Sequence, residues 1–349
     1  MQTRINKLLN DISADEAVLI TGKANIFYYS GFRSEDAYLL ISHNRQIIVT
    51  DSRYTIQAKE QAPDFELCDI TLGASKIFER INAGQILYEE DYITAGRLDK
   101  FKESAKDKSF TASQTKINKP RYVKDDAEVR KIAEAEKIGD EAFSYILDVI
   151  CPGKTEREIA LELEFFMKKQ GAEALSFDTI AASGKRSAMP HGLASEKVIQ
   201  NGDFLTLDFG CIFEGYCSDM TRTVVIGKAD EKQKEIYNTV LLSQQSALSE
   251  ISAGKRCSDI DAAARSVIEK AGYGKNFGHS LGHSVGIEIH ESPVFSPKST
   301  NITEIGHVIT VEPGIYIENF GGVRIEDLVV VTKDGIRNLT KSPKELIEL

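Results

Sequence analysis

Residues 152–171 read PGKTEREIALELEFFMKKQG, and residues 253–272 read AGKRCSDIDAAARSVIEKAG. With an offset of 101 positions the two stretches align without a gap, sharing Gly-Lys near the start, an isoleucine in the middle and Lys-x-Gly at the end. Two ordinary helix starts can share a Gly-Lys turn by chance. A match at both ends favours an internal duplication.

Each copy predicts two helices followed by a β-hairpin. In the first copy an amphipathic helix covers residues 125–150, and Thr155 with Glu158 form a capping box before a helix that stops at Gly171. Hairpins follow at residues 203–227, with Glu214-Gly215 in the turn, and at residues 307–331. We therefore expect two copies of helix, helix and hairpin about a pseudo-two-fold axis.

The N-terminal part has a different pattern. Short apolar runs typical of strands lie at residues 17–21, 25–29, 38–42 and 46–50, and helical patterns lie at residues 54–61 and 97–106. A polar, basic connector interrupted by Pro120 follows. We predict a smaller α/β domain over residues 1–120 and a second domain over residues 121–349, an α+β fold as a whole.

Composition excludes several classes of protein. The 349 residues carry a net charge of −10, so the chain lacks the basic footprint of a nucleic-acid-binding or membrane-surface protein. No apolar run is long enough to span a bilayer, and the N-terminus has no signal-peptide pattern. The five cysteines are scattered, which argues against a disulfide framework. We expect a cytoplasmic protein with reduced thiols.

Two pairs of acidic residues lie in the apolar strands of the hairpins. Asp208 and Asp219 are eleven positions apart, Glu312 and Glu326 are fourteen apart, and each pair is symmetric about its turn. Antiparallel pairing should therefore set the members of each pair opposite each other, with Cβ atoms about 5 Å apart. For one acidic residue alone, exposure beside a Lys or Arg would be the ordinary explanation. Two symmetric pairs in duplicated halves weaken that explanation.

Opposed carboxylates in a half-buried sheet need either a shared proton or bound cations. The histidines favour cations, because three of the six fall in FGHSLGHSVGIEIHE at residues 277–291, and His191 lies in SAMPHG. Carboxylates with one or two imidazoles suit Mn²⁺, Co²⁺, Fe²⁺ or Zn²⁺ better than Ca²⁺ or Mg²⁺. Two divalent ions would neutralise the four carboxylates, so we predict two metal ions per chain, with Mn²⁺ as first choice.

These motifs, together with DFGCIFEGYCSDMTRT (208–223), TVEPGIY (310–316) and GGVRIED (321–327), resemble those of the pita-bread metallopeptidases. That family includes methionine aminopeptidase, aminopeptidase P and prolidase. The resemblance covers residues 121–349. The N-terminal part, with YYSGF and TDSRY, is similar to the smaller creatinase-type domain of aminopeptidase P and prolidase. Creatinase shares the two-domain plan but lacks the metal ligands, which this sequence keeps.

The resemblance implies a role for each matching residue. Asp208 would chelate one metal ion, Asp219 and Glu326 would bridge both, and His283 with Glu312 would complete the other. A hydroxide bridging the two ions would attack the scissile carbonyl. Glu312 would also handle the proton that passes to the leaving nitrogen.

The remaining matches lie around this centre. His191 and His290 would stabilise the tetrahedral intermediate. His279 would line the substrate channel, and Arg324, counted with it on the substrate side, would orient the ligand carboxylates. The family also implies a homodimer.

Two departures from the family pattern stand out. Ser284 follows His283 where family members often have glycine, which changes the local geometry but leaves the ligand untouched. Val294 in HESPVFSP stands where prolidases can carry an arginine for the carboxylate of an Xaa-Pro dipeptide. From Val294 we interpret the chain first as an Xaa-Pro aminopeptidase acting on proline-containing peptides, with Xaa-Pro dipeptidase (prolidase) as the alternative. A non-catalytic pita-bread binding protein is disfavoured because the ligand positions are intact.

Overall fold

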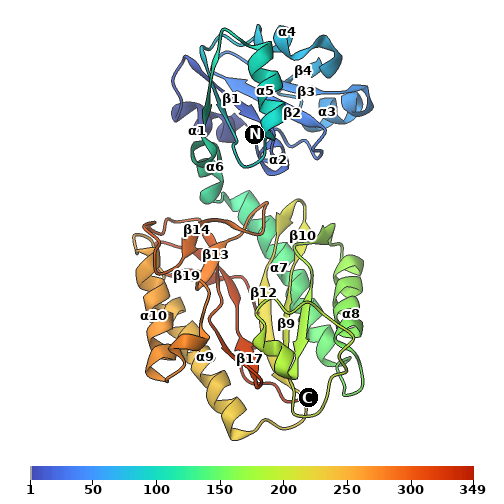
Figure 1. The fold of residues 1–349 in the computed structure, drawn as a ribbon, viewed down its shortest axis with the longest axis vertical. Helices are drawn as coiled ribbons and strands as arrows, with labels where there is room; N and C mark the ends of the chain where they lie inside the picture. Colours follow the sequence, from blue (N-terminus) through green and yellow to red (C-terminus); the bar gives the residue numbers. More distant parts are fainter. Residues whose placement is uncertain (1) are drawn as a thin grey trace. The chain divides into compact units, whose positions relative to one another are not determined.

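The computed structural model describes residues 2–349 and divides the chain between Arg121 and Tyr122 into two compact units (Figure 1). The first unit is built on a mixed six-stranded sheet in the order β4-β3-β2-β1-β5-β6. Its strands are β1 (Glu16–Ile20), β2 (Ala37–Ser42), β3 (Gln46–Thr50), β4 (Glu66–Asp69), β5 (Gln85–Tyr88) and β6 (Ser109–Ala112). Its helices are α1 (Gln2–Asn10), α2 (Lys23–Ser30), α3 (Thr55–Gln61), α4 (Ala74–Phe78), α5 (Ala95–Ser104) and α6 (Gln114–Tyr122). The α/β architecture expected for this part is confirmed.

One predicted strand of this unit is wrong. The run Asn25–Tyr29 lies in α2. The Glu89 carboxylate accepts hydrogen bonds from the backbone N–H groups of Thr21 (2.5 Å) and Gly22 (2.7 Å), which holds the chain directly before the helix. Almost every residue of α2 is buried, and a short helix buried all round has the same continuous apolar pattern as a buried strand. The basic connector is likewise helical, because α6 continues through Pro120.

The second unit contains the duplicated helices. These are α7 (Asp126–Leu147), α8 (Glu156–Lys169), α9 (Glu231–Glu250) and α10 (Cys257–Lys270). The second helix of each pair has 14 residues, and both ends of α10 lie 101 positions after those of α8, as the sequence repeat predicts. Thr155 and Glu158 form the predicted capping box of α8.

The strands of this unit lie between the two helix pairs, with α7 and α8 beside one half and α9 and α10 beside the other (Figure 1). The first half contains β7 (Ala174–Leu175), β8 (Ile180–Ser183), β9 (Phe204–Phe209), β10 (Cys211–Phe213), β11 (Tyr216–Cys217) and β12 (Met220–Val225). The second half contains β13 (Gly282–Ser284), β14 (Glu291–Phe295), β15 (Val308–Val311), β16 (Gly314–Ile317), β17 (Gly321–Arg324), β18 (Asp327–Val331) and β19 (Ile336–Asn338). Two apolar cores, one under each helix pair, support the sheets. The predicted pita-bread architecture is confirmed.

The register of the first hairpin differs from the prediction. Asp208 pairs with Thr221, so Asp219 lies diagonally from Asp208 on the same face instead of directly opposite. The reason is the turn, in which Glu214 and Gly215 both have positive φ (46° and 81°) and Phe213 pairs with Tyr216. A two-residue turn centred on Glu214-Gly215 moves the pairing by two residues while keeping both carboxylates on one face.

The second hairpin keeps the predicted register. Val311 pairs with Asp327 and Gly314 pairs with Arg324, so Glu312 and Glu326 lie opposite each other where the ladder is interrupted. Within residues 2–349, no helix is both long and apolar enough to cross a membrane.

Candidate metal centre

Five predicted ligands come from five places on the two hairpins and the strand between them. Asp208 lies on β9 and Asp219 directly precedes β12, while His283 lies on β13. Glu312 directly follows β15, and Glu326 lies between β17 and β18. Because these strands belong to both copies of the duplication, the side chains meet where the two halves join.

His283 lies at the centre of this group. Its Nε2 atom is 3.5 Å from Asp219 Oδ2 and 3.4 Å from Glu312 Oε1. Potential ligand atoms of Asp219, His283 and Glu326 all lie within 4.8 Å of one another. His283 Nδ1 is 3.2 Å from the Ser284 carbonyl, which can only accept, so Nδ1 carries the proton and Nε2 presents its lone pair to the carboxylates.

Burial and mutual repulsion dominate the electrostatics of the group. Desolvation, followed by repulsion from neighbouring carboxylates, raises the pKa values of Asp219 and Glu326 well above their usual range. Desolvation raises the pKa of Glu312 to about 8 and lowers the pKa of His283 to about 4. Such a group is costly with every carboxylate ionised, unless cations supply the missing positive charge.

Asp208 shows that the donor set fits a metal ion. Its Oδ2 atom accepts a 2.6 Å hydrogen bond from Arg324 Nη2. Its Oδ1 atom is buried and has no hydrogen-bond partner among the described residues. A buried carboxylate oxygen without a donor is expensive, and a cation would satisfy it. Together with the neutral imidazole and the three crowded carboxylates, this makes the residues suitable for divalent metal.

Arg324 connects the ligands to one another. Its Nε donates to Thr221 Oγ1 (3.0 Å), and Thr221 Oγ1 donates to Glu326 Oε2 (2.7 Å). One buried guanidinium therefore orients Asp208 directly and Glu326 through a hydroxyl. The orienting role expected for Arg324 stays a prediction, and the 3% exposure of Arg324 leaves little surface for substrate.

Tyr316 continues this chain and was missed by the sequence analysis. Arg324 Nη1 donates to its hydroxyl (2.7 Å), which lies 3.0 Å from His279 Nε2. His279 Nδ1 lies 2.7 Å from the Ser280 carbonyl, so Nδ1 donates and Nε2 accepts from Tyr316. Both ring nitrogens of His279 are thus engaged within the protein. A lining role for this residue would use the ring surface.

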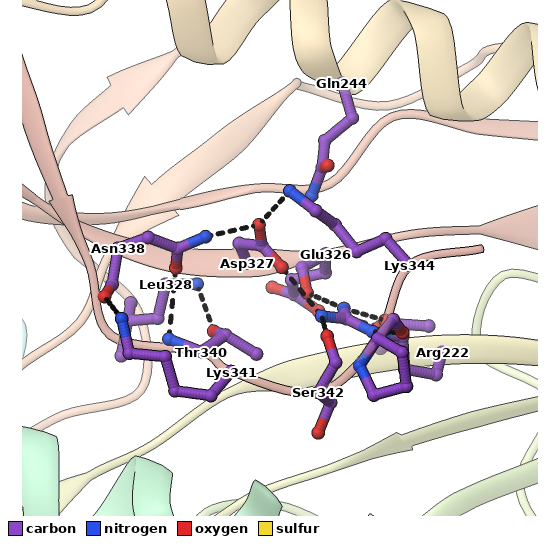
Figure 2. Close-up of polar contacts among 12 residues, drawn as sticks. Arg222, Gln244, Glu326, Asp327, Leu328, Asn338, Thr340, Lys341, Ser342 and Lys344 are labelled. Carbon is purple, nitrogen blue, oxygen red and sulfur yellow. Dashed lines mark hydrogen bonds and ion pairs between the residues drawn. The ribbon is translucent and has the colours of Figure 1, made fainter.

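A second support lies behind Glu326 (Figure 2). The buried Asp327 carboxylate is 2.8 Å from Arg222 Nη2 and 2.7 Å from Lys344 Nζ. Arg222 also donates to the backbone carbonyls of Thr221 and Glu326. The remaining Arg222 donors reach the carbonyls of Pro343 (2.9 Å) and Ser342 (2.8 Å). All five guanidinium N–H groups of Arg222 therefore have acceptors. These hydrogen bonds hold the backbone at Thr221 and Glu326 against the C-terminal segment.

Glu136 is another residue that the sequence analysis missed. It lies on α7, is fully buried, and accepts from the Asp219 backbone N–H (3.2 Å) and from Thr340 Oγ1 (2.5 Å). Desolvation raises its pKa to about 8. Its only sequence signal was a carboxylate on the apolar side of an amphipathic helix.

His290 and His191 lie at the exposed side of the centre. The rings of His290 and His283 meet edge to face with centroids 4.4 Å apart. Desolvation and then the charge of His191 lower the pKa of His290. The backbone next to His191 is also in contact with the centre, because Arg324 Nη1 donates to the Pro190 carbonyl (3.3 Å). Both histidines are exposed and therefore open to a ligand.

Comparison with known proteins gives matches over both units. Residues 130–333 match metallopeptidase family M24, and residues 3–123 match the creatinase/prolidase N-terminal domain. The structure of an Xaa-Pro dipeptidase from Bacillus anthracis is similar with a TM-score of 0.96 and 43% identity, covering 100% of this chain and 99% of that one. An Xaa-Pro dipeptidase from Pyrococcus horikoshii is 39% identical over 99% of both chains. The structure of an X-Pro aminopeptidase from Thermotoga maritima gives a TM-score of 0.92 and 38% identity, covering 99% and 100%.

Proposed function

The chain belongs to metallopeptidase family M24, and we propose that it is an Xaa-Pro dipeptidase that uses a divalent metal centre held by Asp208, Asp219, His283, Glu312 and Glu326. The observation that carries the proposal is the convergence of these five side chains, with the unpartnered Oδ1 of Asp208 among them. Divalent ions held there supply Lewis acidity, which lowers the pKa of a bound water and polarises a carbonyl. We propose that each chain binds two ions, with Mn²⁺ as the first choice and Co²⁺, Zn²⁺ or Fe²⁺ as alternatives.

The choice of dipeptidase over aminopeptidase reverses the preference drawn from Val294. That preference rested on a single position, at which valine stands instead of an arginine that would bind the carboxylate of a dipeptide. Relatives that are 38–43% identical over nearly the whole chain include several named Xaa-Pro dipeptidase or prolidase. The aminopeptidase reading is kept as the second candidate because of Val294 and the similar Thermotoga structure.

The protein's own groups supply positioning and proton transfer. Glu312 accepts from Thr310 Oγ1 (3.1 Å) through the same oxygen that approaches His283, so its carboxylate is fixed at the centre. A carboxylate fixed at this place is positioned to take up a proton and to pass it to the leaving proline nitrogen. His290 and His191, exposed beside the centre, are placed to donate hydrogen bonds to the oxygen of the tetrahedral intermediate.

The test compares three peptides on one preparation. Purified protein is stripped with a chelator, reloaded with Mn²⁺, and given Leu-Pro, Leu-Pro-Gly and Leu-Gly, with release of free leucine as the readout. We expect metal-dependent release from Leu-Pro, less from Leu-Pro-Gly and none from Leu-Gly. Preference for the tripeptide would establish the aminopeptidase instead. Absence of metal-dependent release from both proline peptides would contradict the proposed function.

A further inference from the structure

Glu156 is a buried carboxylate that the reaction described above does not use. It is the first residue of α8 and has 0% exposure. An acidic residue in the first helical turn is favoured by the helix dipole, but full burial of a carboxylate requires strong hydrogen-bond partners. Its partners all lie at the two ends of one segment, residues 183–195.

Five donors converge on this carboxylate. Oε1 accepts from Ser183 N (2.7 Å) and Ser183 Oγ (2.9 Å). Oε2 accepts from Arg186 Nε (2.9 Å), Ser195 N (3.1 Å) and Ser195 Oγ (2.6 Å). Hydrogen bonds to an ionised acceptor are stronger than neutral ones. One side chain therefore binds Ser183, at the beginning of the segment, with one oxygen, and Arg186 together with Ser195, at its end, with the other.

The segment between these ends is residues 184–194, here called the His191 segment. Arg186, held by Glu156, donates from Nη2 to the Leu193 carbonyl (2.6 Å), which closes the segment across its base. Ser187 Oγ accepts from the Gly322 backbone N–H (2.9 Å), and the Pro190 carbonyl accepts from Arg324. The segment is thus fixed at its base by Glu156 and touches the ligand-bearing hairpin near its tip.

We propose that Glu156 is a positioning residue for His191, because its carboxylate fixes both ends of the segment that presents His191 beside the metal centre. This inference rests on the proposed function of His191 as a hydrogen-bond donor to the reacting oxygen. A displacement of that donor by about 1 Å is enough to lower turnover about 100-fold. Glu156 itself does not contact the substrate.

The variant Glu156→Gln tests the proposal with little change of shape. Glutamine retains one acceptor oxygen, but its NH₂ group would face the donors at one end of the segment. The matched control is Glu158→Gln, two positions further along α8, where the carboxylate accepts hydrogen bonds from Thr155 and glutamine can keep the capping box. Both changes are made in the wild type and in His191→Ala.

Activity is measured on each Mn²⁺-loaded protein, and the NMR signal of His191 is measured on each metal-free protein. We expect Glu156→Gln to lower kcat on Leu-Pro about 10-fold to 100-fold in the wild type and less than about 3-fold in His191→Ala. Glu158→Gln should leave kcat nearly unchanged in both backgrounds. We also expect Glu156→Gln, unlike Glu158→Gln, to shift the imidazole NMR signal of His191, assigned from its loss in His191→Ala. An equal activity loss in both backgrounds would overturn the proposal, as would an unmoved His191 signal.

Two further arms separate this proposal from the proposed function. If the wild type cleaves Leu-Pro and His191→Ala is fully active, the positioning role is overturned while the dipeptidase assignment stands. If the wild type cleaves no proline peptide, the His191 signal alone decides the positional claim. Should Glu156→Gln not fold, Ser195→Ala removes the 2.6 Å donor at one end and is expected to shift the same signal by a smaller amount.

Discussion

The Tyr316 hydroxyl lies 2.7 Å from Arg324 Nη1 and 3.0 Å from His279 Nε2, so one phenol bridges the cation that holds Asp208 to a histidine outside the ligand group. Tyr316→Phe removes the bridge and leaves a buried guanidinium donor without its acceptor. We expect kcat/KM on Leu-Pro and the affinity for Mn²⁺ to fall about 10-fold to 100-fold. Metal content after dialysis and steady-state kinetics measure the two effects.

Tyr273→Phe is the matched control, because the Tyr273 hydroxyl contacts Glu235 (2.7 Å) on the surface of the same unit. It should leave both quantities unchanged. If Tyr316→Phe retained wild-type metal affinity and activity, the bridge would not contribute to holding Asp208.

Asp219→Asn tests the centre more directly. Asp219 lies 3.5 Å from His283 Nε2 and its ligand atom is one of the three that cluster within 4.8 Å. An amide cannot supply the negative charge of a carboxylate ligand, so we expect loss of bound metal and of nearly all turnover. The fold should remain, because Asn also relieves carboxylate repulsion in the metal-free state. Circular dichroism measures the fold, and metal analysis measures bound metal, with the exposed Asp126→Asn as control. Retained turnover would contradict the metal-centre assignment.

Local patterns in the sequence predicted much of the fold, and where they failed the cause was a longer-range interaction. The repeat of α8 in α10 and the Thr155–Glu158 capping box depend on neighbouring residues and could be read directly. The helical conformation of Asn25–Tyr29 depends on Glu89, more than 60 positions away, and could not be read from the local sequence. The two-residue shift at Asp208 followed from centring the hairpin one residue too early.

The site shows the same division. The carboxylates and histidines of the metal group stood out because polar residues in apolar strands are unusual. Tyr316, Glu136 and Glu156 carry no such signal, since tyrosine and helix-borne glutamate are common and most of their partners lie 27 to 204 positions away. Only the folded chain shows the contacts that these side chains make.

Removal of metal should have an effect on stability that grows with pH. Burial raises the pKa of Glu312 to about 8, above its value of about 4.5 in the unfolded chain. In the metal-free protein the contribution of this group to stability is present below about pH 4.5 and is lost as the pH rises through about 8. Metal ions favour the ionised form, so we expect the gain in Tm on adding Mn²⁺ to increase between about pH 6 and pH 8, with protons released on binding. A gain in Tm that is constant with pH would contradict this linkage.

A buried histidine outside the metal centre, His307, should limit stability in acid. Burial lowers the pKa of His307, which is 3% exposed, to about 4, and the nearby charge of Lys124 adds to this. Because the unfolded chain takes up this proton near pH 6.5, stability is lost as the pH falls from about 6.5 to 4. His307 Nδ1 accepts from the Glu304 backbone N–H (3.1 Å), an acceptor that asparagine can replace.

We therefore expect His307→Asn to lose less free energy of unfolding between pH 7 and pH 5 than the wild type, by about 2 kcal/mol. Denaturant unfolding at the two pH values measures the difference. His43→Asn is the control, since His43 lies in the other unit and its Nε2 atom is 3.2 Å from the Ile12 carbonyl. Equal losses in His307→Asn and the wild type would show that another group governs acid sensitivity.

Val294 offers a way to change the substrate preference. It pairs with His283 across β13 and β14, so the two side chains lie on the same face of the sheet with Cβ atoms about 5 Å apart. An arginine at this position would extend from beside His283, a proposed metal ligand, and we expect it to reach the carboxylate of a bound dipeptide. A charge-assisted hydrogen bond contributes about 1.5–3 kcal/mol, so we expect Val294→Arg to lower KM for Leu-Pro about 10-fold to 100-fold. KM for Leu-Pro-Gly, whose carboxylate lies one residue further away, should change little, and Val294→Met controls for side-chain length without charge. Equal effects of arginine and methionine, or an equal gain for both peptides, would mean that the added guanidinium does not reach the dipeptide carboxylate.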